Sequence, residues 1–346
     1  MLQEAKVIVN PASRNGRTGK LWPSLSEKMN ASGFAHQWEM TTGQGDGWRI
    51  AREAVQQGFN RIIAVGGDGT VNEVINGLFE NDRLINPDLA FGVLSMGTGG
   101  DFIKAVGIPG IIDDAIRYLT CNRVERVDIG KARFVGNDGQ VADRYFLNIA
   151  DLGLGAETVD RVNHTTKAFG GFISFLWGTL VSLLHYRNKA TEITIDGGET
   201  FRTQLTLCAI ANGTHFGGGM NIAPLAKLND GLFDVVLCQG FSKPEIIANL
   251  RRLYGGTHLD HPKVGYWKAT RLKISSPEKL LLELDGEQPG VAEVEFSILP
   301  AALNLYVPIE SNIAALSPCT PEENCAGAGA ATVERGHIAA EGVPVE

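Results

Sequence analysis

Two short acidic segments contain the residue types that could do chemistry. In Gly66-Gly67-Asp68-Gly69-Thr70, three glycines surround one carboxylate. Glycines let a ligand approach the backbone, and the amides of such a turn favour a phosphate. Asp68 would repel that phosphate unless it binds a metal ion or handles a proton. Asp285-Gly286-Glu287 places two acids one glycine apart after an apolar strand. Either segment could also be only a tight turn.

A buried strand and a helix must position Asp68. Residues Arg61 to Val65 form an apolar run rich in β-branched residues, which is typical of a central parallel strand. Thr70-Val71-Asn72-Glu73 has the spacing of a capping box, so a helix is expected to begin there. The helix face expected to pack on the sheet comprises Val71, Val74, Ile75 and Leu78.

Three further strands of the same kind are expected. They are Ala5 to Val9, His36 to Met40 and Leu89 to Leu94. Each is followed by a polar loop and a helical pattern, which predicts a parallel α/β sheet with its loops at the carboxyl ends of the strands. Asp46 is expected to cap the second helix. The loop from Asn10 to Lys20 lacks the spacing of a Walker A motif, and no G-x-G-x-x-G fingerprint occurs.

The second half of the chain reads as an antiparallel β-sandwich. Its expected strands are Val124–Lys131, Arg144–Ile149, Thr191–Ile195, Thr203–Ala211, Leu232–Cys238, Arg271–Ser275, Lys279–Leu284 and Ala292–Ile298. Helices are expected over Lys167–His185 and Lys243–Leu253, and Asp151 to Ala156 reads as a glycine-rich loop.

These patterns predict two domains. An N-terminal parallel α/β domain should span residues 1–123, and a β-sandwich domain should span residues 124–298. Residues 311–346 are rich in Ala, Gly, Glu and Pro and are expected to be a disordered tail.

Composition narrows the class of protein. The 346 residues are 44% hydrophobic and 20% charged, as in ordinary soluble proteins. A net charge of −8 argues against a nucleic-acid partner. The five cysteines show no C-x-x-C or metal-finger spacing, which favours reduced thiols in the cytoplasm. Ala168 to Leu184 is uncharged but only 17 residues long with three glycines, so a buried or lipid-facing helix is expected there, without a transmembrane span.

The motifs resemble those of the diacylglycerol kinase catalytic domain, which is shared with sphingosine kinases and more distantly with NAD kinases. The resemblance runs from about Lys6 to about Val307 and includes the Gly-Gly-Asp-Gly-Thr signature. The family usually has an asparagine where this chain has Gly100, which leaves Thr98 and Asp101 in register. The resemblance also implies that the last strands, within residues 299–310, return to complete the first domain.

The resemblance implies an ATP- and Mg²⁺-dependent lipid kinase, with a nucleotide-binding first domain, a lipid-substrate second domain and the active site in the cleft between them. Its substrate would be a lipid alcohol, first of all diacylglycerol, giving phosphatidic acid. A sphingoid base, ceramide or monoacylglycerol is an alternative substrate, and a catalytically inactive nucleotide- or lipid-binding regulator is an alternative function. The resemblance further implies a cytoplasmic protein that contacts the bilayer surface only transiently. The sequence leaves a homodimer open.

The resemblance also assigns roles to individual residues. Glu287 would be the general base, supported by Asp285, while Asp68 would help hold Mg²⁺ or orient the acceptor; which of Asp68 and Glu287 dominates stays open. A structural Mg²⁺ would bind the Asp230 side chain and the carbonyls of Lys227 and Leu232, donors that suit a hard cation. Asp230-Gly231 is equally a common hairpin turn. The nucleotide-binding residues would be Asn10, Thr42, Gly66, Gly67, Asp68, Gly69, Thr70, Val71, Asn72, Glu73 and Thr98.

Overall fold

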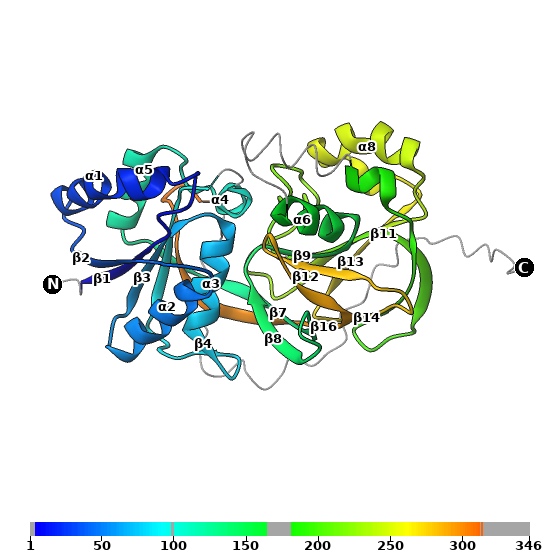
Figure 1. Ribbon diagram of the computed structural model, residues 1–346, viewed down its shortest axis with the longest axis horizontal. Helices are drawn as coiled ribbons and strands as arrows, with labels where there is room; N and C mark the ends of the chain where they lie inside the picture. The colour runs from blue at the N-terminus through cyan, green and yellow to red at the C-terminus, as the bar shows by residue number, and fades with distance from the viewer. Residues whose placement is uncertain (1–3, 98–99, 165–180, 312, 314–346) are drawn as a thin grey trace, which may run out of the picture.

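The computed structural model describes residues 4–97, 100–164, 181–311 and 313. These residues form two lobes that lie side by side (Figure 1). The chain enters the left lobe of the view at its N-terminus and crosses to the right lobe along β7 (Val124–Gly136). It crosses back along β16 (Glu287–Tyr306), whose last residues return to the first lobe. The two predicted architectures, α/β followed by all-β, are confirmed.

The first lobe is a parallel sheet covered by helices on both faces. The strands stand in the order β16-β6-β3-β1-β2, with parallel pairing throughout. Figure 1 shows α1 and α5 on one side of this sheet and α2 and α3 on the other. The elements are β1 (Ala5–Val9), α1 (Arg17–Ala31), β2 (His36–Met40), α2 (Asp46–Gln56), β3 (Arg61–Gly66), α3 (Asp68–Leu78), β4 (Phe79–Glu80), β5 (Arg83–Leu84), β6 (Ala90–Ser95), α4 (Asp101–Val106) and α5 (Ile112–Thr120).

All six residues of β3 are buried, which shows that this strand lies in the middle of the first core. The helix face that was predicted to pack on the sheet is also buried, since Val71 is 4% exposed and Val74, Ile75 and Leu78 are fully buried. The central strand and its helix therefore fix the turn that joins them, residues Gly66 to Asp68, at the carboxyl edge of the sheet.

The second lobe is built almost entirely of antiparallel strands. Besides β7 and β16, its elements are β8 (Val141–Phe146), β9 (Ile149–Gly153), α6 (Leu154–His164), β10 (Lys189–Ile195), β11 (Phe201–Ala211), β12 (Phe233–Gln239), α8 (Lys243–Gly255), the 3-10 turn His258–Asp260, β13 (Val264–Ala269), β14 (Arg271–Ser275) and β15 (Leu281–Leu284). Its core is closed by side chains from both layers of strands, including Phe134, Phe146, Leu205, Phe233 and Phe296.

Two long strands belong to both lobes. In β7, Val127 and Ile129 join the first core, whereas Ala132 and Phe134 join the second. In the same way β16 passes from the second core to the first, and its end pairs with β6 in parallel. The end of β16 therefore lies in the first lobe, and the two cores divide within β7 and β16. The predicted domain bounds stay a prediction.

Several local predictions were wrong. Helix α3 begins at Asp68, with Gly67 as its extended N-cap, so Thr70 and Glu73 do not form a capping box. Residues Asp151 to Ala156 are not a loop but the end of β9 and the first turn of α6. Strand β13 was not predicted, and α1 begins at Arg17, inside the expected loop.

Three predictions fall on residues outside the described part of the chain. They concern Thr98, most of the segment from Ala168 to Leu184, and nearly all of the tail from residue 311. Among the residues that are described, no helix is long and apolar enough to cross a membrane.

Candidate active site

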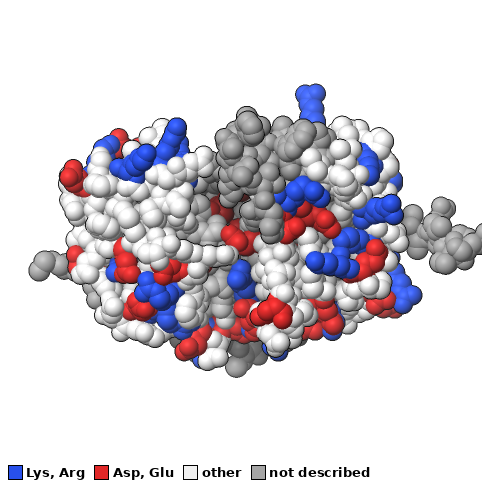
Figure 2. Space-filling model, in the orientation of Figure 1, with Lys and Arg blue, Asp and Glu red and all other residues white. Residues whose placement is uncertain are grey.

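One large cavity lies between the lobes. Its volume is about 980 Å³, and residues of both lobes line it. The glycine-rich turns and the loop after β2 line one end, the Asp285-Gly286-Glu287 turn lies beside them, and apolar side chains of the second lobe line the rest. Figure 2 shows acidic side chains gathered near the middle of the molecule, where the lobes meet. Of the predicted nucleotide-binding residues that are described, Gly66 and Asn72 do not line the cavity.

The two glycine-rich turns pack directly on each other. A Cβ atom built on Gly97 would lie 2.9 Å from the Cα of Gly67, closer than real Cβ atoms approach backbone. Both turns follow neighbouring strands, β3 and β6, whose carboxyl ends meet at this edge. The first turn opens the 11-residue helix α3, so the backbone amides and the helix dipole favour an anion there.

Asp68 stands at the first position of α3 and is half-buried. Burial, followed by the charges of Asp101 and Asp285, raises the pKa of Asp68 to about 7, against a lowering by Lys104 and the Gly100 N–H. This crowding of carboxylates is the electrostatic situation in which a group binds a cation or exchanges a proton near neutral pH.

Asp285 is the most heavily hydrogen-bonded acid of the site. It accepts backbone N–H bonds from Leu147 at 2.8 Å, Asn148 at 2.9 Å and Ile149 at 3.1 Å, and an Asn72 side-chain bond at 3.0 Å. Burial raises the pKa of Asp285, whereas these bonds lower it. Because its oxygens are all engaged, Asp285 can support the turn but is not free to receive a substrate proton.

Glu287 reaches back over the start of α3. Asp285 and Gly286 both have positive φ, 48° and 91°, which closes a two-residue hairpin between β15 and β16. This hairpin directs Glu287 to the first lobe, where a Cβ built on Gly69 would lie 2.7 Å from Glu287 Oε1. The third glycine of the signature therefore leaves room for the carboxylate of Glu287.

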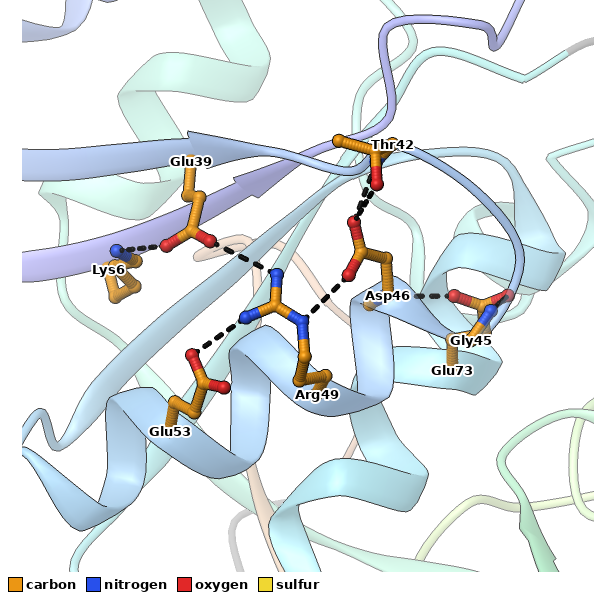
Figure 3. Close-up of polar contacts among 9 residues, drawn as sticks. Lys6, Glu39, Thr42, Gly45, Asp46, Arg49, Glu53 and Glu73 are labelled. Carbon is orange, nitrogen blue, oxygen red and sulfur yellow. Dashed lines mark hydrogen bonds and ion pairs between the residues drawn. The ribbon is translucent and has the colours of Figure 1, made fainter.

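Thr42 is held by a network of charged groups (Figure 3). Its N–H and hydroxyl both donate to Asp46 Oδ2 at 2.7 Å, and Asp46 Oδ1 accepts from Arg49 Nε at 2.8 Å. The bonds from Thr42, with help from Arg49, lower the pKa of Asp46 to about 2. Asp46 was predicted to cap α2, and this prediction was wrong. The N-cap is Gly45, and the Asp46 carboxylate fixes Thr42 instead.

Glu73 connects α3 to the start of α2. Its two oxygens accept the N–H groups of Gly45 at 2.8 Å and Gly47 at 3.0 Å (Figure 3). A carboxylate at a helix N-terminus satisfies donors that lack partners within the helix and interacts favourably with the dipole.

Asn10 and Asn72 join separate segments around the first turn. The Asn10 amide donates to Thr70 Oγ1 at 2.9 Å, which links the loop after β1 to α3. The Asn72 amide donates to Asp285 and to the Tyr145 carbonyl, both at 3.0 Å. Asn72 therefore connects the two lobes by hydrogen bonds and does not line the cavity.

The predicted metal-binding turn lies away from the cavity. Asp230 Oδ2 pairs with Lys268 Nζ at 2.6 Å, and Lys227 and Leu232 flank it along the chain. The next residue, Gly231, donates its N–H to the buried Asp128 at 2.7 Å. Within the described residues, no group of three or more His, Cys, Asp or Glu side chains is arranged to hold a metal ion. The metal assignment stays a prediction.

The residues that form the apolar part of the cavity were not predicted from the sequence. Helix α6 was missed, although Leu154, Thr158 and Val162 recur at helical spacing, which was the available signal. The apolar lining of the cavity includes Leu154, Val159, Leu207, Phe216, Met220 and Ile246.

Asp101 and Lys104 also belong to the site. Asp101 is 6% exposed, pairs with Lys104 Nζ at 3.0 Å, and accepts the Gly218 N–H of the second lobe at 2.7 Å. The side chain of Asp101 therefore contributes to closing the cavity between the lobes.

Comparison with known proteins identifies both lobes. Residues 4–132 match the model of the diacylglycerol kinase catalytic domain, and residues 148–307 match that of the YegS C-terminal NAD kinase beta sandwich-like domain. A relative from Bacillus subtilis (strain 168) named "Diacylglycerol kinase" is 33% identical over 309 residues, 89% of this chain and 98% of the relative. One from Chromohalobacter salexigens named "Probable lipid kinase YegS-like" is 30% identical, covering 85% of this chain and 91% of the relative.

Solved structures share the fold. A crystal structure from Bacillus anthracis strain Sterne matches with a TM-score of 0.71 at 24% identity, covering 88% of this chain and 95% of the other. A second one from that strain, described as that of a diacylglycerol kinase, matches with a TM-score of 0.64 at 20% identity, covering 88% and 97%.

Replacing Glu73 should destabilise the first lobe. In Glu73→Ala the Gly45 and Gly47 N–H groups lose their acceptor, so the free energy of unfolding should fall by about 1–2 kcal/mol. Glu53→Ala is the control, because Glu53 forms an exposed ion pair with Arg49 within α2 and should contribute about 0.3–0.5 kcal/mol. Urea unfolding of the three proteins measures the difference; equal losses in both variants would contradict the capping role.

Proposed function

The chain belongs to the diacylglycerol kinase catalytic-domain family and is a lipid kinase, and from this we propose that it transfers the γ-phosphate of ATP to the hydroxyl of diacylglycerol, giving phosphatidic acid. The observation that supports this most directly is the cavity between the lobes, which has glycine-rich turns at one end and an apolar lining at the other. A nucleotide and a lipid could therefore meet beside Glu287.

The first lobe would hold the phosphates. Its backbone amides at the start of α3 offer donors and a helix dipole to a phosphate chain. Asn10 and Thr42 line the same end of the cavity, each on a loop that follows a strand. Phosphoryl transfer asks mainly for such positioning and charge stabilisation.

Glu287 would accept the proton of the acceptor hydroxyl. The lipid oxygen forms a bond to the γ-phosphorus as the bond from that phosphorus to the β–γ bridging oxygen breaks, and ADP leaves. The proton of the hydroxyl passes to the Glu287 carboxylate. A carboxylate is a weak base, so the fixed position of Glu287 beside Gly69 matters more than its basicity.

The residues around Asp68 fit a divalent cation. Asp101 and Asp285 both raise the pKa of Asp68, and a cation among these carboxylates would relieve their repulsion. Asp68 and Asp101 would hold the Mg²⁺ that accompanies ATP, which neutralises phosphate charge during transfer. Asp68 orienting the acceptor hydroxyl is the other role compatible with its place.

The apolar end would take the acyl chains. Side chains from α6, β11 and α8 line it, among them Val159, Leu207 and Ile246. A cytoplasmic protein with this cavity would meet its substrate at the bilayer during transient contact. On the face in Figure 2, acidic and basic side chains are interspersed, which fits contact that does not depend on one large basic patch.

The lipid specificity is tested directly by phosphorylation assays. Purified protein, labelled ATP and Mg²⁺ are incubated separately with diacylglycerol, monoacylglycerol, ceramide and a sphingoid base in mixed micelles. We expect labelled phosphatidic acid to form fastest. Faster labelling of another lipid would replace diacylglycerol as the substrate, and ATP binding without labelling of any lipid would favour the inactive regulator.

Asp68→Asn should abolish turnover and keep the fold. The substitution is nearly isosteric, so lost activity would report the lost charge rather than lost packing. The same lipid assay and a thermal melt measure both properties. Near-normal turnover with unchanged thermal stability would mean that the Gly66–Thr70 segment is only a tight connection.

Glu287→Gln should lower kcat by roughly 10²-fold or more, the usual scale for loss of a positioned acid–base group. The amide keeps the shape beside Gly69 but cannot take the proton, so ATP affinity should change little. Steady-state kinetics and nucleotide titration separate the two effects. A variant that keeps kcat but loses ATP binding would show that Glu287 serves the nucleotide.

Asp230→Ala tests the proposed structural Mg²⁺. One carboxylate binds Mg²⁺ weakly, and an ion held here would displace Lys268 from Asp230. We expect Mg²⁺ at millimolar concentration to raise the Tm of the ATP-free wild type and not that of the variant, because a ligand of the folded state stabilises it. Activity should also fall, because the turn beside Asp128 would shift.

The exposed Asp88→Ala variant is the control for nonspecific effects of Mg²⁺ on the protein. If Mg²⁺ shifts the Tm of wild type and Asp230→Ala equally, or shifts neither, the metal assignment is wrong and Asp230 is a hairpin residue.

A further inference from the structure

Two acids outside the predicted catalytic set face each other beneath the Asp285-Gly286-Glu287 turn. Asp151 on β9 and Glu283 on β15 are directly opposite in the antiparallel pairing of these strands. They are 1% and 5% exposed, and both line the cavity. Their carboxyl groups hydrogen-bond to each other, which requires a proton on one of them.

Each acid also binds one backbone N–H, and these two bonds lead to different parts of the site. Asp151 Oδ1 accepts the N–H of Ala156 at 2.7 Å, in the first turn of α6. Glu283 Oε1 accepts the N–H of Gly286, between Asp285 and Glu287. The acid pair therefore forms a continuous connection from the helix that lines the apolar end of the cavity to the turn that carries Glu287.

The surroundings of the pair favour the protonated form. Burial raises the pKa of Asp151 to about 7. The pKa of Glu283 is also raised, mainly by burial and in addition by the charges of Asp151 and Asp285. The hydrogen bond from the Gly286 N–H lowers it in part. The other titratable groups that face Asp151 are Tyr186 and Cys208; burial raises the pKa of each, so both are neutral near pH 7.

We propose that Asp151 and Glu283 share one proton and act as positioning residues, holding the turn that carries Glu287 in register with helix α6. The proposal rests on the proposed role of Glu287 in phosphoryl transfer. A shared proton lets two adjacent buried carboxyl groups attract rather than repel each other. The bond to Gly286 then fixes the hairpin from one side, while Asp285 fixes it from the other.

The pair predicts a particular dependence of stability on pH. A carboxyl group whose pKa is raised in the folded state stabilises the fold fully below its unfolded pKa, near 4.5 for Glu283. That contribution is lost as the pH rises through the folded pKa. In Glu283→Gln the amide can donate to Asp151 and accept from Gly286 without a titrating proton, so the loss should be absent.

Thermal melts from pH 5 to pH 9 measure this dependence. The Tm of Glu283→Gln minus that of wild type should increase with pH, by roughly 2 °C or more across the range. Glu295→Gln is the control, since Glu295 lies exposed on β16 beside Lys273, and its Tm should follow wild type at every pH. A constant difference between Glu283→Gln and wild type would overturn the shared proton. This result does not depend on any lipid being phosphorylated.

Kinetics test the positioning role. Glu283→Met fills similar space but leaves the Gly286 N–H without its acceptor, so kcat should fall by roughly tenfold to a hundredfold while KM for ATP stays unchanged. Glu283→Gln should restore kcat at pH 7. Wild-type kcat in Glu283→Met, or no rescue by a folded Glu283→Gln, would overturn the proposal. If the Met variant does not fold, Asp151→Asn takes its place beside Glu283→Gln, and both should retain kcat; loss of kcat in either folded variant would overturn the proposal.

Discussion

The buried carboxylate of Asp285 is the contact on which the rest of the site depends. It accepts two backbone N–H groups from the connection between β8 and β9, one from the first residue of β9, and one amide from Asn72 in α3. A buried ionised acid without such donors would cost several kcal/mol. Three of the donors belong to the same lobe as Asp285, and the docking of the first lobe supplies the fourth, Asn72. That arrangement also places Glu287 against Gly69, at the start of the helix whose amides face the cavity.

The two lobes contribute different chemistry to the one cavity. The first lobe offers backbone donors and a helix dipole, which suit an anion and need no side chains beyond the turns. The second lobe offers acids on paired strands and an apolar lining from helices that pack beside them. Strands β7 and β16 continue through both cores, so the two halves of the site are joined by continuous hydrogen-bonded backbone rather than by a flexible linker.

Glycine positions show how closely the site is packed. Gly97 lies against the backbone of Gly67, and Gly69 lies against the Glu287 carboxylate, so a side chain at either position would meet an atom of the site. The signature therefore has a steric meaning as well as an electrostatic one. The chain's Gly100, where the family usually has asparagine, has a φ of 61° at the N-cap of α4, a conformation that Asn tolerates better than most residues.

The sequence alone determined the elements whose signal is local. The bounds of β1, β2 and β14 agree with the predicted ranges, and the strand, glycine turn and helix around Asp68 were found because burial periodicity and turn residues lie within a few positions of one another. The same local reasoning failed at Glu73 and at Asp151. Glu73 has the spacing of a cap for its own helix but binds the start of α2, and Asp151 stands among glycines yet pairs with Glu283.

Only the tertiary structure decided which of these residues act together. Asn72 and Asp285 are 213 positions apart, and Asp101 and Gly218 are 117 apart, so no periodicity or spacing encodes their contacts. Such partners are selected by the docking of whole strands and helices, in which the cost of burying each polar group must be met by a donor or acceptor from elsewhere in the chain. The sequence specified the turns that could bind a phosphate; the packing of the two lobes determined which acid faces them.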